Sequence, residues 1–329
     1  MKTEWTRRQA MRGLGGGLAL LASRPTMAEA AYPNRTLKLI EPYPPGGTTD
    51  LLGRLIADQI KSGLNATVIV ENKPGAGSTL GADLVAHAPP DGYTLLLATS
   101  TTLAIDKTLY KKLPYDPVKD FAAISLVASV PFALIVNPLI PAKTLSEFIA
   151  YAKANPGLAY GSAGNGSPQH LGAELLKTQA GIDIRHVPYR GSVPAMLDVI
   201  ANHISFMIVD LEPALPQIKD GKLRVLGVTT PKRVAVAPDI PTMAESGLPG
   251  YQLIAWQGVV APAGTPRDVV DALAAQIGKM LADPATSGRL AKLAIEPLPG
   301  STPDSFAAFI KTEVDRWATI VKNSGAEAQ

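Results

Sequence analysis

The chain alternates strand-like and helix-like segments, and this alternation restricts its possible folds more than any other feature. In the first part, apolar strand-length runs at 36–41, 67–70 and 93–98 are separated by helix-period runs at 49–60 and 78–86. A βαβαβ order of this kind is typical of a parallel sheet with helices on its faces. The sequence therefore predicts an α/β fold.

The same order restarts in the middle of the chain. The predicted elements are helices at 145–154, 168–180 and 193–201, strands at 158–160, 185–188, 204–209 and 223–228, an extended segment at 251–261, and helical stretches within 267–293 and 304–322. No linker or internal repeat separates the halves, which indicates a chain that crosses between two lobes more than once. We predict that 31–132 plus 255–329 form lobe 1 and 133–254 form lobe 2. Each lobe is then a mainly parallel sheet flanked by helices, as in periplasmic binding proteins, with a ligand cleft between them.

The stretch 121–142 contains no charged residue, so a membrane-spanning helix has to be considered. Such a helix needs about 20 consecutive, mainly apolar residues. Three prolines interrupt this stretch, and its apolar parts at 124–127 and 132–136 have the length of strands. We predict two buried strands here.

The first thirty residues have the features of an export signal. Arg7 and Arg8 precede a short apolar run at 14–22, and a small-residue cleavage pattern ends at Ala30. The arginine pair and the glycines that dilute the run favour the twin-arginine (Tat) route over Sec. We predict a signal peptide over 1–30, cleaved after about Ala30, and a periplasmic mature protein. The alternative is an amphipathic N-terminus without a targeting role.

The charge of the mature chain excludes nucleic acid as its partner. The whole sequence contains 31 basic and 28 acidic residues. Residues 1–30 hold five of the basic and two of the acidic ones, which leaves 26 of each. Nucleic-acid binding requires a basic surface that offsets phosphate charge. Cysteine is absent, which excludes disulfides, thiol nucleophiles and thiolate metal sites.

Three strand-to-helix turns are unusually rich in glycine and hydroxyl residues. The first, at 43–50, has two prolines, then Gly46 and Gly47, then Thr48 and Thr49 at the start of a helix. Free N–H groups at a helix start favour an anion, and ligands of open α/β sheets lie beyond the carboxyl ends of strands. The turn is therefore a candidate anion site, and an ordinary capped turn is the alternative.

The second and third turns have similar chemistry. The second, at 98–102, offers the hydroxyls of Ser100 and Thr101 directly after a buried strand. The third, at 160–170, leads into a helix through three glycines and two serines. A hydroxyl-rich helix cap is the alternative for each. One such turn in each lobe suggests two surfaces that face each other across a cleft.

Catalytic and cofactor motifs are missing. The glycine loop at 72–77 lacks the third glycine of a dinucleotide site, and no Walker A lysine or G-x-S-x-G elbow occurs. The four histidines have no metal-ligand spacing. We therefore expect no metal, no cofactor and no enzyme activity. Asp210, at the end of a predicted strand, either caps the next helix or lines the cleft, and we favour the cleft. Whether Tyr189, Arg190 or Trp256 reaches a ligand is left open.

An ordered set of motifs resembles one family of binding proteins. The matching segments are Tyr43-Pro-Pro-Gly-Gly-Thr-Thr-Asp50, Val70-Glu-Asn-Lys-Pro-Gly-Ala-Gly77, Pro90-Asp-Gly-Tyr-Thr-Leu95, Tyr115-Asp-Pro-Val-Lys-Asp-Phe121, Tyr160-Gly-Ser-Ala-Gly-Asn-Gly-Ser167, Val187-Pro-Tyr-Arg-Gly191, Pro238-Asp-Ile-Pro-Thr242, Gly247-Leu-Pro-Gly-Tyr251 and Ala261-Pro-Ala-Gly-Thr-Pro266. The chain is similar to the periplasmic receptors of tripartite tricarboxylate transporters, also called the Bordetella uptake gene family of solute-binding proteins.

The resemblance implies a monomeric, two-lobed receptor that closes on a small organic carboxylate and delivers it to the integral membrane subunits of a transporter. It implies ligand contacts from the three turns and the cleft. These residues are Tyr43, Gly46, Gly47, Thr48, Thr49, Ser100, Thr101, Ala163, Gly164, Ser167 and His170, to which our own interpretation adds Asp210. Where many relatives have a third glycine, this chain has Thr48. A ligand sensor for a signalling partner and an exported α/β hydrolase are the alternatives.

Overall fold

The computed structural model describes residues 32–324 and 326 of the 329-residue chain. The predicted signal peptide and its cleavage point lie outside these residues. Arg35–Gln329 forms one compact unit, and the description below concerns the described part of that unit.

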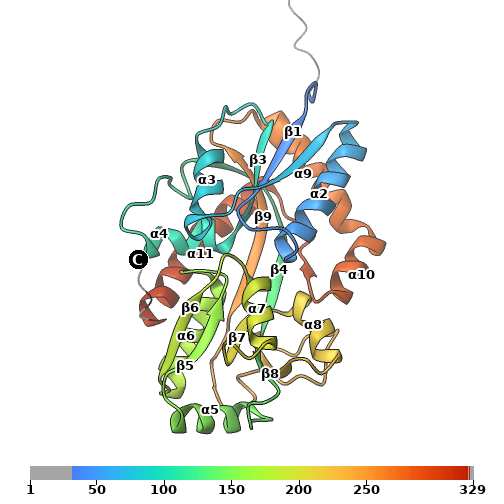
Figure 1. Ribbon diagram of the computed structural model, residues 1–329. Coiled ribbons are helices and arrows are strands. Elements are labelled where there is room, and N and C mark those ends of the chain that lie inside the picture. The colour runs from blue at the N-terminus through green and yellow to red at the C-terminus, as the bar shows by residue number, and fades with distance from the viewer. Residues whose placement is uncertain (1–31, 325, 327–329) are drawn as a thin grey trace, which may run out of the picture. The chain divides into compact units, whose positions relative to one another are not determined.

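Strands and helices alternate as the sequence predicted (Figure 1). The strands are β1 Leu37–Glu41, β2 Val68–Asn72, β3 Thr94–Thr99, β4 Phe121–Val136, β5 Leu158–Ser162, β6 Ile184–Pro188, β7 Phe206–Asp210, β8 Arg224–Val228, β9 Ile254–Pro262 and β10 Glu296–Pro297. The helices are α2 Thr48–Leu64, α3 Thr79–Ala86, α4 Asp106–Leu109, α5 Leu145–Ala154, α6 Pro168–Ala180, α7 Ser192–Ile200, α8 Leu211–Lys219, α9 Arg267–Ala282, α10 Pro284–Lys292 and α11 Pro303–Ser324, with short helical turns η1 Ala76–Ser78 and η2 Thr101–Ile105.

The strands form one mixed sheet in the order β2-β1-β3-β9-β4-β7-β5-β6, with β8 and β10 also paired to β4. Pairing is parallel in both outer parts, β2-β1-β3 and β7-β5-β6. It is antiparallel in the middle, where β9 and β4 lie. The carboxyl ends of the parallel strands therefore belong to two separate groups, one in each half.

The two halves meet along β4 and β9, which run side by side through the centre of Figure 1. Up to Pro131, β4 pairs with β9, and from Phe132 onward it pairs with β7 and β8. The prediction of two separate strands in this stretch is wrong, because 121–136 is one continuous strand. Pro131 lies at the last position paired with β9, where the missing N–H of proline interrupts the ladder least.

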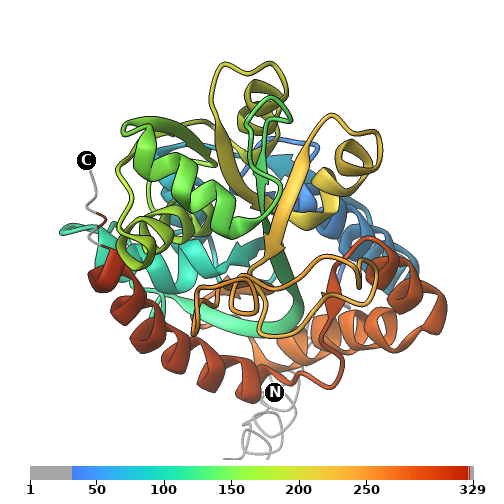
Figure 2. The ribbon, with the colours of Figure 1, turned by 90° about the horizontal axis from the view of Figure 1, so that it is seen from below.

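Helix α11 packs against elements of both halves. It contacts η2, α4 and β4 on one side and α6 on the other, and Figure 2 shows it as a long helix along one side of the unit. Glu313 of this helix is buried. It accepts hydrogen bonds from the indole N–H groups of Trp256, at 2.7 Å, and Trp317, at 3.0 Å. Trp256 thus fastens β9 to α11, and it is not among the described residues that line the pocket below.

Candidate ligand-binding site

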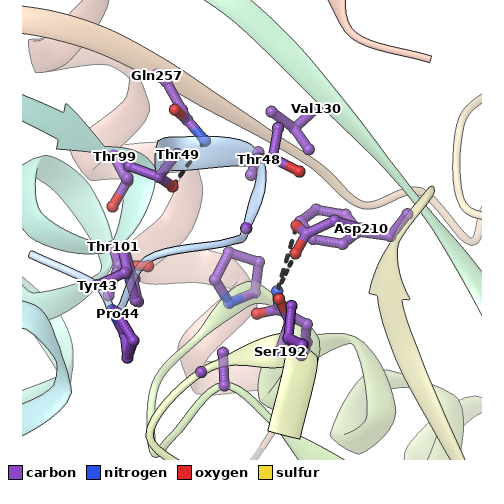
Figure 3. Close-up of a pocket in the computed structure, with 18 of the residues that line it drawn as sticks. Tyr43, Pro44, Thr48, Thr49, Thr99, Thr101, Val130, Ser192, Asp210 and Gln257 are labelled. Atoms are coloured by element: carbon purple, nitrogen blue, oxygen red, sulfur yellow. Dashed lines mark hydrogen bonds between the residues drawn. The ribbon is translucent and has the colours of Figure 1, made fainter. Parts of the chain in front are cut away.

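A pocket lies where turns from both halves of the sheet meet (Figure 3). The space between the lining residues is about 620 Å³, which includes a part open to solvent. Most of its wall comes from the carboxyl ends of β1, β3, β5, β6 and β7, and the remainder comes from β4 and β9. The lining residues are Tyr43, Pro44, Pro45, Gly47, Thr48, Thr49, Thr99, Thr101, Val130, Phe132, Ala163, Pro168, Gln169, Gly191, Ser192, Val193, Pro194, Asp210, Ala255 and Gln257.

The turn between β1 and α2 presents the start of a helix to the pocket. Gly47 is the N-cap residue of α2, and no side chain caps the helix there. The first N–H groups of α2 are therefore available to an anion. Gly46 has φ +96°, a left-handed conformation that glycine adopts without strain. Its N–H donates to Asp50, so Gly46 shapes the turn, while Gly47 lines the pocket.

The hydroxyls of Thr48 and Thr49 connect this turn to other elements. Thr48 Oγ1 donates to Glu212 Oε2 of α8, at 3.4 Å, which joins the two halves of the sheet. Thr49 Oγ1 accepts from Gln257 Nε2 of β9, at 3.1 Å. Both residues line the pocket, and hydrogen bonds to α8 and β9 fix the positions of their hydroxyls.

The end of β3 contributes neutral hydroxyls. Thr99 and Thr101 line the pocket, whereas Ser100 is fully buried and is not among the lining residues. Tyr43 lies beside Thr101 at the same side of the pocket (Figure 3). Burial raises the pKa of the Tyr43 phenol, which keeps it a neutral hydrogen-bond donor at physiological pH.

In the turn between β5 and α6, only Ala163 of the four predicted residues lines the pocket. Ser167 caps α6 by accepting from the His170 N–H, and its hydroxyl donates to the Gly164 carbonyl. His170 Nδ1 accepts from the Gly166 N–H. Ser167 and His170 therefore stabilise the loop through hydrogen bonds to its own backbone. Burial lowers the pKa of His170 to about 4, so this ring is neutral.

An adjoining pocket shares Tyr43, Pro44 and Ala163 with the first. Its wall includes Gly164 from the turn after β5 and both Tyr189 and Arg190 from the segment after β6. These three residues are thus near the site without lining the main pocket.

A fourth turn forms part of the site, and sequence reasoning missed it. Gly191, Ser192, Val193 and Pro194 open α7 after β6 and line the pocket. The signal was present, since a Gly-Ser pair follows a predicted strand and starts a predicted helix. A Cβ placed on Gly47 would lie 4.0 Å from Ser192 Oγ, so this turn faces the first one closely.

Two glutamines were also missed. Gln169 is the second residue of α6, and Gln257 lies within the apolar strand β9. Both are almost fully buried, and both line the pocket. A buried amide in an apolar strand is the signal that identifies Gln257, because such a group needs hydrogen-bond partners.

Asp210 ends β7 at the pocket wall. It occupies the N-cap position of α8, yet its side chain does not cap that helix. The Gln169 amide donates to both carboxylate oxygens, at 3.3 Å each. Burial raises the pKa of Asp210 to about 6. Burial and the charge of Asp210 also raise the pKa of Glu212, on the first turn of α8.

Within the described residues, no group of three or more histidine or acidic side chains is placed to hold a metal ion. None of the helices in that part of the chain combines the length and apolar character needed to cross a membrane.

The structure resembles solved periplasmic binding proteins over most of the chain. The TM-score is 0.86 with periplasmic binding protein BugD, at 37% identity, covering 91% of this chain and 100% of BugD. It is 0.87 with Rpa4515 of R. palustris solved with adipate, at 34% identity, covering 90% and 99%. It is 0.84 with MatC of Rhodopseudomonas palustris solved with malate, at 34% identity, covering 88% and 100%. The fold is therefore that of a two-lobed periplasmic binding protein, as the sequence predicted.

The family of receptors follows from the sequence comparison. The model of the tripartite tricarboxylate transporter family receptor matches residues 52–326. BugT of Bordetella pertussis is 36% identical over 298 residues, which are 90% of this chain and 91% of BugT. The chain belongs to this receptor family, which confirms the resemblance seen in the motifs. Because the family consists of solute-binding receptors, the prediction that the chain is not an enzyme is also confirmed.

Proposed function

We propose that this protein is a periplasmic receptor that captures a small organic carboxylate and delivers it to the membrane subunits of a tripartite tricarboxylate-type transporter. One observation carries the proposal: an uncapped helix start and neutral hydroxyls line the pocket where turns of both halves meet. Backbone N–H groups at a helix start and hydroxyls are suitable partners for a carboxylate. Two related structures were solved with adipate and with malate, and both of these ligands are carboxylates.

The predicted site residues take two roles in this proposal. One group holds the ligand directly: Tyr43, Gly47, Thr48, Thr49, Thr101, Ala163 and Asp210. The other group shapes or supports the turns: Gly46, Ser100, Gly164, Ser167 and His170. The missed residues Ser192, Gln169 and Gln257 join the first group.

Closure of the lobes follows from shared contacts. Lobe 1 is proposed to comprise 31–132 and 255–329, and lobe 2 to comprise 133–254. The change of partner in β4 at Pro131–Phe132 and the start of β9 at Ile254 support these limits. A ligand that contacts both lobes binds the closed state more tightly and shifts the population toward it.

Export completes the proposal. Residues 1–30 act as a Tat-type signal peptide cleaved after about Ala30, and the mature protein is a periplasmic monomer. An N-terminal sequence of the protein purified from the periplasm checks the cleavage point, and its mass in solution checks the monomer.

Thermal unfolding of the exported protein with a panel of carboxylic acids tests the binding function. The protein is first unfolded and refolded to remove any ligand that purified with it. A ligand at about 100 times its Kd adds about 2.7 kcal/mol of stability, which raises Tm by several degrees for a chain of this size. If no mono-, di-, tri-, aromatic or amino-carboxylic acid in the panel raises Tm, the carboxylate function is wrong.

A further inference from the structure

The charge of the pocket is unusual for a site that holds an anion. Of its twenty described lining residues, one carries a charged side chain, and that residue is Asp210. No lysine, arginine or histidine is among them. Burial raises the pKa of Asp210 only to about 6, so the carboxylate is ionised at neutral pH. A ligand with two carboxylates would bring a second negative charge to a wall without a compensating cation.

The charged acceptor and one cluster of hydroxyls lie on different sides of the pocket. Tyr43, Thr99 and Thr101 lie on one side near the start of α2, and Asp210 lies on the other (Figure 3). The Thr99 hydroxyl has no hydrogen-bond partner among the described residues. The donor side therefore suits the carboxylate of a ligand, and the other side requires a different chemical group.

The group required beside Asp210 is a donor. The Gln169 amide N–H faces Asp210, which leaves its carbonyl oxygen Oε1 as a buried acceptor. This oxygen has no partner among the described residues. Asp210 accepts two long bonds from Gln169, at 3.3 Å each, and Ser192 is a further hydrogen-bonding neighbour. Both neighbours are neutral, so neither offsets the charge of the carboxylate. Buried acceptors without donors are costly in an empty site and are satisfied when a ligand brings N–H groups.

We propose that Asp210 is a specificity residue that selects an amino-carboxylic acid, a zwitterion whose ammonium group lies against Asp210 and Gln169 Oε1, over an unsubstituted dicarboxylate. An ammonium group carries hydrogen-bond donors for the acceptors of this wall and one positive charge, which offsets the charge of Asp210. This inference rests on the proposed carboxylate function. It narrows the ligand class from any small acid to one with a cationic substituent.

Matched ligands of equal carbon number test the selection. Calorimetry on the exported, refolded protein compares the α- and ω-amino acids of three to six carbons with the dicarboxylate and the monocarboxylate of the same length, for example 4-aminobutanoate, succinate and butanoate. At one length or more, an amino acid is expected to bind at least tenfold more tightly than both partners. Tighter binding of a dicarboxylate or monocarboxylate at every length overturns the inference and leaves the receptor function intact. If none of the three classes binds at any length, this inference is overturned, and the thermal-unfolding panel described above decides the carboxylate function separately.

Two variants assign the selection to Asp210. Asp210→Asn keeps the size of the side chain and removes its charge, so the ratio of amino acid to dicarboxylate affinity is expected to fall at least tenfold. Asp220→Asn makes the same change of net charge at the exposed far end of α8, where Asp220 pairs with Lys222, and should leave the ratio unchanged. An unchanged ratio in Asp210→Asn, or an equal fall in both variants, would show that Asp210 does not select the ligand.

Discussion

We predict that Asp210 lowers the stability of the ligand-free protein at neutral pH. Its pKa is about 6 in the folded state against an ordinary value of 3.8. Because the folded protein binds this proton more tightly than the unfolded chain does, Asp210 contributes fully to stability below pH 3.8. That contribution is lost as pH rises through 6. Asparagine does not ionise, so the Asp210→Asn variant does not lose stability in this pH range. We expect the variant to be about 1–3 kcal/mol more stable than the wild type at pH 7 and nearly equal at pH 4, as measured by urea unfolding. Lower stability of the variant at pH 7 would contradict this account.

Glu41, at the end of β1, is a second buried acid near the first turn. Burial, with the charge of Asp50, raises its pKa to about 8. Its Oε2 accepts from Asn72, while Oε1 has no partner among the described residues. The folded state holds this proton while the unfolded chain releases it, so stability falls as pH rises from 4.5 to 8. Glu41→Gln should flatten the decrease and be about 2–4 kcal/mol more stable at pH 8. Equal slopes of unfolding free energy against pH in the two proteins would refute the shift.

At the scale of elements, the turn between β1 and α2 offers a direct test of the site. Gly47 has φ −96° and ψ −179°, an extended conformation that valine also adopts. Its added Cβ would meet only Ser192 Oγ, at 4.0 Å. Gly47→Val should therefore fold with a loss of about 1 kcal/mol or less, while its methyl groups fill the space between the two turns. We expect binding to weaken at least a hundredfold by calorimetry.

A valine at Gly278 of α9 is the control, because a Cβ there meets nothing within 4 Å and the residue is not part of the pocket wall. Gly278→Val should bind as the wild type does. Unchanged affinity in Gly47→Val would show that the first turn does not hold the ligand.

Elements were predictable where the signal is local. The alternation of apolar runs located most strands and helices, and α5 and α6 begin and end at the predicted residues. The continuity of β4 was not predictable, because Pro131 is tolerated only through a change of partner strand that the sequence does not reveal. The four pocket residues of β4 and β9, which are Val130, Phe132, Ala255 and Gln257, were missed. Their role depends on pairing between segments more than a hundred residues apart.

The sequence located the polar residues of the turns, but it did not show whether their side chains point into the pocket or toward the backbone. Ser167 and His170 are polar residues of a glycine-rich turn, yet both hydrogen-bond to backbone groups within the turn. A serine at a helix N-cap faces its own helix, so its cap role competes with ligand binding. Asp210 has the cap position without the cap bond, and its side chain is therefore left for the pocket.

At the scale of the whole unit, Glu313 connects β9 to α11. Strand β9 lies at the junction of the two halves, and α11 contacts elements of both. It accepts from Trp256 of β9 and Trp317 of α11, and it pairs with Arg316. Glu313→Ala leaves two buried indole N–H groups and a partly exposed guanidinium without their acceptor. We expect a loss of about 2–4 kcal/mol in the free energy of unfolding. Glu313→Gln keeps one acceptor oxygen and should lose less than half as much.

The form of the transition decides whether α11 couples the halves. Because α11 contacts η2 and α4 in one half and α6 in the other, its loosening should weaken both together. Tryptophan fluorescence, which reports Trp256 and Trp317, and far-UV circular dichroism, which reports the whole chain, should then give coincident urea transitions at a lower midpoint in Glu313→Ala. If the fluorescence transition shifts alone, Glu313 stabilises only its own neighbourhood. The two halves would then be connected by β4 and β9 without help from the terminal helix.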